Sequence, residues 1–400
     1  MRLSTAEFTQ NAISSILQQQ SQLNHTQEQL STGRNIVTPA DNPPGAAQAL
    51  QLQSAIDTNS QWIKNGNAAT ADLNLEQSAL NQVKNVLQRV RTLVIEANNG
   101  SQNNQSRAGI ASEVSQSLKE VLGFANTRDS SGNYIFSGSQ VHTSPFSQNA
   151  SGGFSYAGDS LQRYIQIGSS RQVASNDPGS AVFMQIPAGN GTFTATAAST
   201  NTGTGIIDPG SVINPSAYTG DTYQIKFTSA NTFTVTDTTT NTIVLNNQTY
   251  QSGANISFSG IQTHISGAPA AGDTFSIAPS GQQSIFQTLQ NIVTTLNTPA
   301  NGTVSLTALH NQVNQELSSL DQGLNNVINV QASVGSRLEA INSQQALQQD
   351  WGLQLQTAQS KIQNLDYAKA ISLFQQQLTA LKAAEQTYTK VQGLSLFNYL

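Results

Sequence analysis

Apolar residues recur at intervals of seven positions in both halves of this chain. The N-terminal tracks comprise Leu73, Leu80, Leu87 and Val94, with Val83, Val90 and Ala97 three or four positions out of phase. The C-terminal tracks comprise Leu317, Leu324 and Leu338, with Leu320, Val327, Val334 and Ile341 out of phase. This repeat is typical of helices that pack along their length. It predicts that these residues form internal core and that a helix over roughly 50–98 is about 70 Å long.

The composition changes between these two helical zones, over residues 141–281. This zone contains seven of the eleven prolines and no glutamate, and Thr, Gly and aromatic residues become frequent. In KFTSANTFTVTDTTTNTIVL apolar and polar residues alternate, which indicates short strands between turns. We expect Phe227, Phe233 and Phe258 to lie in the core of a β-sandwich. GDTYQIKF and GDTFSIA form a weak internal repeat, in which each Gly-Asp turn leads into a strand.

The order helical, β, helical predicts a mainly α fold with an inserted all-β domain. Because heptad helices need partners, we expect the N- and C-terminal segments to form one long coiled-coil-like bundle. The predicted domains are a terminal helical assembly domain (1–40 plus 365–400), a long-helix bundle (41–140 plus 282–364) and a β-rich outer domain (141–281).

Turn residues mark the predicted boundaries. Gly33 has the position of a left-handed residue that closes the first helix. Asp41 or Asn42 is expected to cap the next helix, with Pro43 at its first position. In RDSSGNYIFSG the chain is expected to leave a helix and bend at Gly132-Asn133.

The polar residues show no credible catalytic, cofactor or metal site. Asp, Glu, Lys and Arg make up only 10% of the chain, and a net charge of −5 does not favour binding to nucleic acid or to an anionic membrane. There is no cysteine, and the four histidines, His25, His142, His264 and His310, have no second ligand at metal spacing. Asp72 and Glu76 could be considered an acid–base pair, but their place on a heptad helix favours capping and solubility.

The N-terminal stretch MRLSTAEFTQNAISSILQQQ has no continuous apolar segment and does not read as a conventional secretory signal. The longest apolar runs fall short of the 18 residues that indicate a membrane span. We therefore expect neither a cleaved signal peptide nor a membrane anchor.

Both chain ends carry apolar residues that a two-helix arm alone cannot fully bury. The conformational entropy of ordering such an arm exceeds what its apolar contacts return, so contacts from neighbouring copies are expected to complete it. The predicted assembly interface comprises Ile16, Leu23, Leu30, Ile371, Phe374, Leu378, Leu381 and Tyr388, together with the tail residues Leu396, Phe397, Tyr399 and Leu400.

Four separated motifs, in the right order, carry a family resemblance. TQEQLSTGRNIVTPADNPPGAAQAL resembles the N-terminal signature of the flagellin superfamily. RDSSGNYIFSG, LDYAKAI and VQGLSLFNYL are similar to the narrower group of flagellar hook-associated protein 3, at the distal hook–filament junction. The resemblance covers roughly 1–140 and 282–400. The first motif departs from the family pattern at Asn42, where Asp is usual, and at Pro44, which follows Pro43.

The resemblance implies a structural, non-enzymatic role in the extracellular flagellum. It implies self-association in a ring or helical layer, with the proximal hook-associated junction protein on one side and flagellin on the other. It also implies type III export with a dedicated chaperone. In this family both chain ends are disordered in the monomer and pack into a tubular core on assembly. The interface residues other than Tyr388 acquire their tube-lining and sealing roles from this resemblance.

Two other readings of the sequence remain. The chain could be a flagellin, the bulk filament subunit, although flagellins generally lack the NYL ending and the DYA motif at this spacing. It could instead be a surface adhesin whose β domain stacks exposed aromatic residues on sugars. Polymerisation alone discriminates the first alternative, and deletion of 141–281 discriminates the second.

Overall fold

The computed structural model describes residues 5–150 and 152–393, and the chain divides into two compact units. One unit comprises residues 1–64 and 343–400, and the other comprises residues 65–342. The α-helices are α1 (Thr5–Thr32), α2 (Pro43–Ala97), α3 (Asn104–Ala125), α4 (Ile285–Asn297), α5 (Thr303–Gln363) and α6 (Tyr367–Gly393). Helices therefore flank a central β region, and the predicted fold class is confirmed. The three-part domain division stays a prediction.

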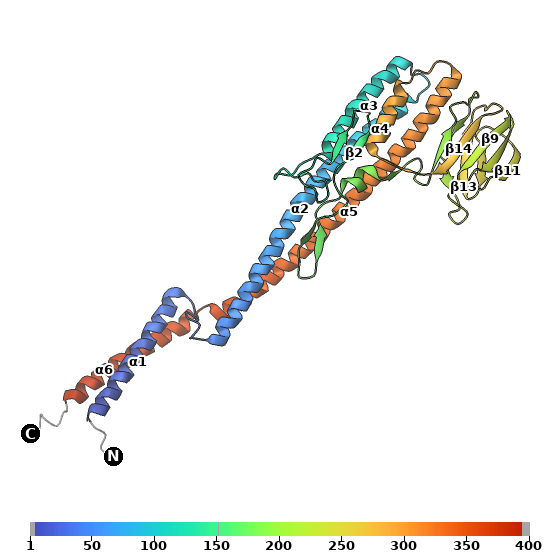
Figure 1. Ribbon diagram of the computed structural model, residues 1–400. Coiled ribbons are helices and arrows are strands. Elements are labelled where there is room, and N and C mark those ends of the chain that lie inside the picture. Colours follow the sequence, from blue (N-terminus) through green and yellow to red (C-terminus); the bar gives the residue numbers. More distant parts are fainter. Residues whose placement is uncertain (1–4, 151, 394–400) are drawn as a thin grey trace, which may run out of the picture. The chain divides into compact units, whose positions relative to one another are not determined.

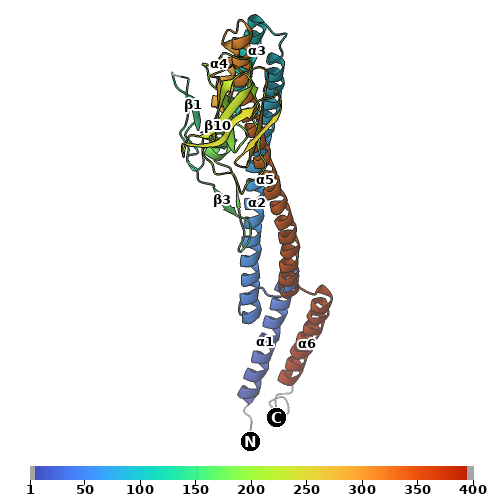
Figure 2. The same cartoon turned by 90° about the vertical axis from the view of Figure 1, so that its right-hand side faces the viewer.

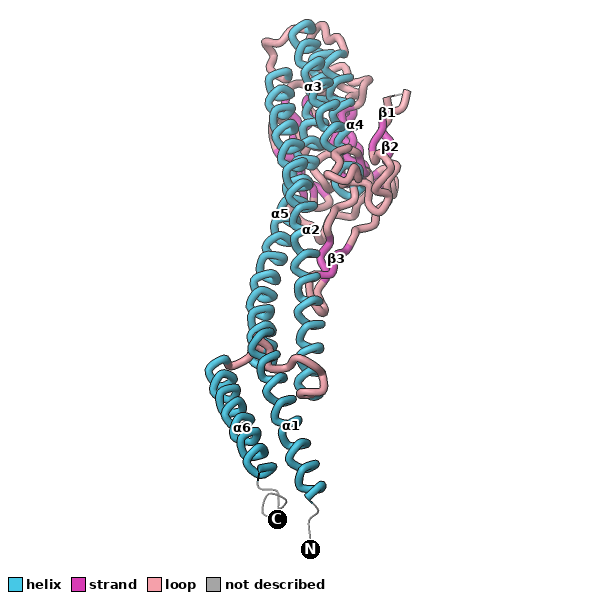
Figure 3. The backbone as a smooth tube through the Cα atoms, turned by 90° about the vertical axis from the view of Figure 1, so that its left-hand side faces the viewer, coloured by secondary structure: helices cyan, strands magenta, loops and turns pink. Residues whose placement is uncertain are grey.

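In the terminal unit, α1 and α6 lie side by side and run in opposite directions (Figures 2 and 3). Gly33 follows α1 with a φ of 70°, as the sequence predicts. The chain segments that follow α1 and precede α6 bond to each other. Asn35 N donates to Gln363 O at 2.8 Å, and Leu365 N donates to Gly33 O at 3.0 Å. This pairing fixes the point at which the terminal helices begin.

The turn before α2 resolves the predicted choice of cap. Asn42 caps the helix, because its Oδ1 accepts from Gly45 N at 3.1 Å, and Pro43 is the first helical residue. Asp41 instead stabilises the preceding turn, where its carboxylate accepts from the Thr38 and Val37 N–H groups at 2.7 and 2.9 Å. These bonds, the Thr38 N–H first, lower the pKa of Asp41 to about 2.

In the larger unit, α3 and α4 lie beside the two long helices α2 and α5 (Figure 1). The N-terminal heptad tracks are fully buried, and so is the second C-terminal track. Leu317, Leu324 and Leu338 pack against the same core while partly exposed. The expectation that the heptad residues form internal core is confirmed.

Between α3 and the sandwich, residues 126–187 form short hairpins and a π-helical turn, η1 (Ser180–Met184), on the bundle. Their strands are β1 (Phe146–Gln148), β2 (Phe154–Tyr156), β3 (Tyr164–Gln166), β4 (Gln172–Ala174) and β5 (Ile186–Pro187). A cluster of rings joins this segment to α4, where Phe286 lies 5.1 Å from Phe146 and 5.8 Å from Phe183 between ring centroids. Strand β15 (Gln282–Gln283) pairs with β5 and leads the chain into α4.

The β-sandwich has its own core, separate from that of the bundle. One sheet has the order β11-β10-β9-β14-β6, and the other has the order β12-β13-β7 with β8 also paired to β13. These strands are β6 (Phe193–Ala197), β7 (Ile206–Ile207), β8 (Ser211–Val212), β9 (Tyr223–Ser229), β10 (Thr232–Asp237), β11 (Thr242–Thr249), β12 (Asn255–Phe258), β13 (Ile261–Ser266) and β14 (Thr274–Pro279). Phe227, Phe233 and Phe258 are buried, as predicted. The two strands of the weak repeat, β9 and β14, pair with each other in antiparallel fashion.

Candidate functional site

The terminal helices present the candidate functional surface. Seven of the predicted interface residues are half-buried on α1 and α6, namely Ile16, Leu23, Leu30, Phe374, Leu378, Leu381 and Tyr388. Ile371 is 50% exposed. Leu396, Phe397, Tyr399 and Leu400 lie outside the described residues.

Two helices cannot bury all of each other's apolar surface. Thr26 lies between them, and its Oγ1 donates to Gln377 Oε1 at 2.8 Å. The apolar residues on the outer faces remain in solvent, among them Phe8, Ile13, Leu17, Ile371, Leu373 and Val391. Water therefore covers apolar surface that a neighbouring helix could cover instead.

A mostly apolar groove of about 260 Å³ lies between α1 and α6. It is lined by Phe8, Ala12, Ser15, Ile16, Ala384, Thr387, Tyr388 and Val391. The groove brings together two residues predicted from the sequence, Ile16 and Tyr388. Phe8 and Val391 were not predicted, although both continue the apolar spacing of their helices.

A second set of exposed apolar side chains lies in the same unit, on α2 and α5. Trp351 is 53% exposed, and the others are Leu50, Leu347 and Leu353. The sequence analysis missed these residues because it assigned the long helices to internal core. A signal was present, because Leu347, Trp351 and Leu353 all lie off the heptad track that buries Ile341 and Leu355.

Two buried carboxylates correct an expectation from the sequence. Glu76 was assigned with Asp72 to capping and solubility, but its side chain is only 1% exposed. The reason is its place in the seam between Leu73 and Leu80, where the segment after β4 covers it and Asp177 N donates to its Oε1 at 3.2 Å. Burial raises the pKa of Glu76 well above its ordinary value. Glu316, on α5, is buried as well.

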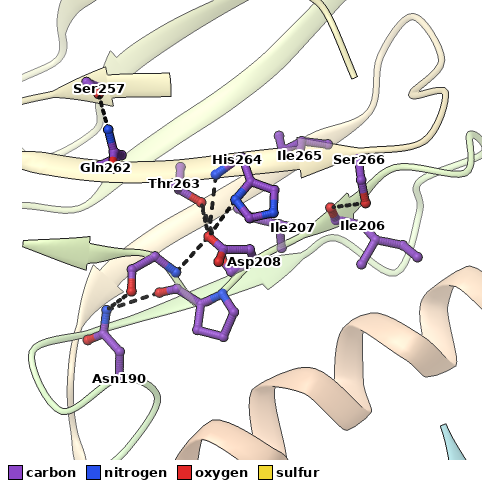
Figure 4. Close-up of polar contacts among 12 residues, drawn as sticks. Asn190, Ile206, Ile207, Asp208, Ser257, Gln262, Thr263, His264, Ile265 and Ser266 are labelled. Atoms are coloured by element: carbon purple, nitrogen blue, oxygen red, sulfur yellow. Dashed lines mark hydrogen bonds and ion pairs between the residues drawn. The ribbon is translucent and has the colours of Figure 1, made fainter. Parts of the chain in front are cut away.

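The sandwich contains a polar cluster centred on Asp208 (Figure 4). Its Oδ1 accepts from Gly210 N at 2.9 Å and from Thr263 Oγ1 at 3.3 Å, and it lies 3.5 Å from His264 Nδ1. Asn190 Nδ2 donates to the adjacent Pro209 and Gly210 carbonyls at 3.0 and 3.1 Å. These bonds hold a turn of the chain, which is a structural role for the carboxylate.

Across residues 5–150 and 152–393, no group of three or more His, Cys, Asp or Glu side chains is arranged to hold a metal ion. Within the same part of the chain, none of the helices combines the length and hydrophobicity that crossing a bilayer requires.

Comparison with known proteins connects both parts of the fold to the flagellum. Residues 3–141 match the family described as the bacterial flagellin N-terminal helical region. Residues 196–279, within the sandwich, match the D2-like domain of flagellar hook-associated protein 1. Flagellar hook-associated protein 3 of Escherichia coli K12 is 25% identical over 398 residues, which is 99% of either chain. A Salmonella naestved phase 1 flagellin is 32% identical over 130 residues, which is 32% of this chain and 25% of the flagellin.

Solved structures agree with this result. The crystal structure of flagellar hook-associated protein 3 from Legionella pneumophila is 35% identical, with a TM-score of 0.75. The match covers 78% of this chain and 98% of that structure. Xanthomonas campestris FlgL is 32% identical with a TM-score of 0.72, over 77% of this chain and 99% of that one.

Paired terminal helices with an incompletely covered apolar surface, a heptad bundle and an inserted sandwich define a flagellin-type structural protein. Its similarity to flagellin itself is partial, whereas its similarity to flagellar hook-associated protein 3 extends over nearly the whole chain. The chain belongs to the flagellar hook-associated protein 3 family, and it is a hook-associated junction protein of the flagellum.

Proposed function

We propose that copies of this chain pack around a tubular axis through the terminal helices and join hook to filament. The observation that supports this most is the apolar surface that α1 and α6 leave in solvent, together with the groove between them. A neighbouring copy supplies helices with the same apolar spacing, so head-to-tail packing covers this surface in every copy except those at the ends.

The exposed apolar residues of α2 and α5 extend the proposed interface. Leu50, Leu347 and Trp351 belong to the same compact unit as α1 and α6, and they are too large and too exposed to be a gain for an isolated molecule. We infer that the self-contact surface continues beyond the predicted limits of residues 40 and 365. The three predicted domains remain the working division of the chain.

The remaining partners follow from family membership and belong to this proposal. The proximal hook-associated junction protein is the partner on the hook side, and flagellin assembles on the other side. The protein is exported to the extracellular flagellum by the type III apparatus, without a cleaved signal peptide, and a dedicated chaperone holds it before export. No cofactor, nucleic acid or membrane enters the proposed role, and the role is structural rather than enzymatic.

Addition of the purified protein to isolated hooks, followed by electron microscopy, tests the proposal. We expect a short layer on hook ends that stops growing, and no long filaments from the protein alone. Long filaments from the protein alone would support the flagellin alternative. In a strain that lacks this protein, filaments are expected to be missing from completed hooks, and normal filaments there would contradict the junction role.

The adhesin alternative has weaker support, because Phe227, Phe233 and Phe258 lie in the sandwich core and cannot stack on sugars. A strain whose protein lacks the sandwich separates the two ideas. Loss of adhesion with intact swimming would favour the adhesin, and loss of both assembly and swimming would show that the sandwich is architectural.

A further inference from the structure

The heptad seam of α2 contains a carboxyl group at a position that otherwise takes apolar residues. Glu76 follows Leu73 by three residues and precedes Leu80 by four, and both leucines are fully buried. Glu76 itself is 1% exposed. An ionised carboxylate at such a position costs several kcal/mol unless a counter-charge or several hydrogen bonds compensate for the lost water.

The contacts of Glu76 compensate only in part for its burial. Its Oε1 accepts from Asp177 N at 3.2 Å, while no group in the described part of the chain bonds its Oε2. The nearest acidic group is the carboxylate of Asp177, which lies within hydrogen-bonding reach. An unbonded oxygen beside a second carboxylate is the arrangement expected when the two groups share one proton.

Asp177 connects Glu76 to α5. Its carboxylate forms an ion pair with Arg337 Nη2, and its Oδ1 accepts from Gln162 Nε2 at 2.9 Å. Arg337 Nη1 donates to the carbonyl of Ala174, at the end of β4, at 3.2 Å. The segment 172–178 is thus held by α2 on one side, through Glu76, and by α5 on the other, through Arg337.

The charged groups around Glu76 oppose one another. The Asp177 carboxylate disfavours ionisation of Glu76, and the Arg337 guanidinium favours it but is already engaged by Asp177. One turn earlier on α2, the half-buried Asp72 faces Arg163 and Asp129, which act on it in opposite directions. Burial is the largest effect on Glu76 and favours the neutral acid.

We propose that Glu76 and Asp177 form a proton-dependent latch that holds residues 172–178 against α2 and α5. When Glu76 is neutral, its O–H donates to the Asp177 carboxylate while Oε1 accepts from Asp177 N–H, so both ends of the contact are satisfied. When Glu76 loses its proton, two adjacent carboxylates repel each other within a poorly hydrated seam. Only one arginine is then present to offset two charges. The segment responds by lifting from the seam and admitting water.

The sign of the pH effect follows from the raised pKa of Glu76. A raised folded-state pKa stabilises the fold at pH values below the ordinary carboxyl range, and this contribution is lost as the pH rises through the folded value. The latch is therefore closed in acid and opens in alkali, which is the reverse of an ordinary Asp–Arg ion pair.

Hydrogen exchange on the full-length protein tests the latch. After correction for the intrinsic exchange rate, protection of residues 172–178 in the wild type is expected to fall about tenfold or more between about pH 6 and about pH 9. In Glu76→Gln the amide retains the acceptor for Asp177 N–H and gains a permanent donor. Its protection is expected to change less than about twofold over the same range. Glu96→Gln, on an exposed part of α2, is the matched control and is expected to behave like the wild type.

Infrared spectroscopy provides a readout that does not depend on the Glu76→Gln variant. In protein labelled with 13C-glutamate and carrying Glu316→Gln, a protonated-carboxyl band should persist at neutral pH and disappear in alkali. Protection that does not change with pH in the wild type, or that falls equally in Glu76→Gln, would overturn the proposal. Absence of the protonated band at neutral pH would overturn it as well.

Discussion

Burial governs the ionisation of individual carboxyl groups in this protein. Glu316 is 8% exposed, and its Oε1 accepts from Asn291 Nδ2 at 3.1 Å. Burial is the main cause that raises its pKa to about 7, and the bonds from Asn291 and Gln283 lower the pKa only in part. In contrast to the exposed carboxylates of the helix surfaces, Glu316 therefore destabilises the fold when it is charged.

Glu316→Gln is expected to stabilise the protein in alkali and to have little effect in acid. Because the folded-state pKa of about 7 exceeds the ordinary value of 4.5, wild-type stability is greatest below about pH 4.5 and is lost as the pH rises through about 7. The variant retains an acceptor for Asn291 and should gain about 3 kcal/mol at about pH 8. Denaturant unfolding at both pH values measures this, with Glu96→Gln as the exposed control. Equal gains at both pH values would contradict the expectation.

Gly33→Ala is expected to destabilise the terminal unit by about 1–2 kcal/mol. Gly33 has a φ of 70°, and an added Cβ would lie 2.7 Å from the hydroxyl of Tyr367. Gly109→Ala is the matched control, since that glycine is in α3 with open space around it and the change should stabilise the helix by about 0.5–1 kcal/mol. Thermal unfolding followed by circular dichroism measures both, and a stabilised Gly33→Ala variant would show that this turn is not strained by a side chain.

At the scale of elements, the two kinds of long helix differ in what covers them. In the larger unit, α2 and α5 are covered by α3, α4 and the hairpin segment, which complete the core. In the terminal unit, α1 and α6 have each other, and half of the interface residues' surface meets water. The same apolar spacing thus yields a closed core in one unit and an open surface in the other, because coverage depends on the number of partner elements.

The double variant Leu378→Ser and Leu381→Ser is expected to abolish motility and leave the melting temperature of the monomer nearly unchanged. Both side chains are half-buried on α6, so their removal costs the isolated chain little, while an assembled tube would lose them in every copy. Ala383→Ser, at an exposed position of α6, is the control and should swim normally. A large fall in the monomer's melting temperature would show that these leucines are internal core.

At the scale of the whole molecule, the sandwich and the bundle are separate folding units. Their cores share no residues, and the chain enters and leaves the sandwich at neighbouring points, where Ser280 N donates to Thr192 O at 3.0 Å. The sandwich is fastened to α5 by polar contacts such as that of Asn311, whose side chain bonds Gly205 O and Ile207 N at 3.0 and 2.9 Å.

Replacement of residues 193–279 by a short glycine–serine linker is therefore expected to leave the helical part folded. The shortened protein should unfold within about 5 °C of the wild type, because the bundle core is untouched and only exposed polar contacts are lost. Circular dichroism at a helical wavelength measures the transition. A shortened chain that fails to fold would show that the sandwich is required for the bundle.

Limited proteolysis of the monomer is expected to cleave near residues 1–40 and 365–400 before it reaches the rest. Local opening costs least where few apolar contacts are lost, and the terminal helices have the fewest covered sides. Mass spectrometry of the early fragments identifies the cleavage sites. First cleavage inside the sandwich or the bundle would contradict the idea that neighbouring copies complete the terminal helices.

Short-range sequence features predicted much of this architecture. The heptad tracks around Leu80 and Val334 predicted buried helical seams, and Gly33 and Asn42 marked real turns, because periodicity and turn chemistry act over a few residues. The eight described interface residues could be placed on α1 and α6 for the same reason. Their role in assembly stays a proposal, since it depends on partners outside the chain.

By itself, the sequence determined where the helices run, where they turn and that a β domain interrupts them. Only the tertiary structure decided that Glu76 and Glu316 are buried acids, that β9 pairs with β14, and that Leu347 and Trp351 stay in solvent. Each of these outcomes depends on which distant segment covers a residue. Local pattern does not encode that, because the covering segment is chosen by the packing of the whole fold.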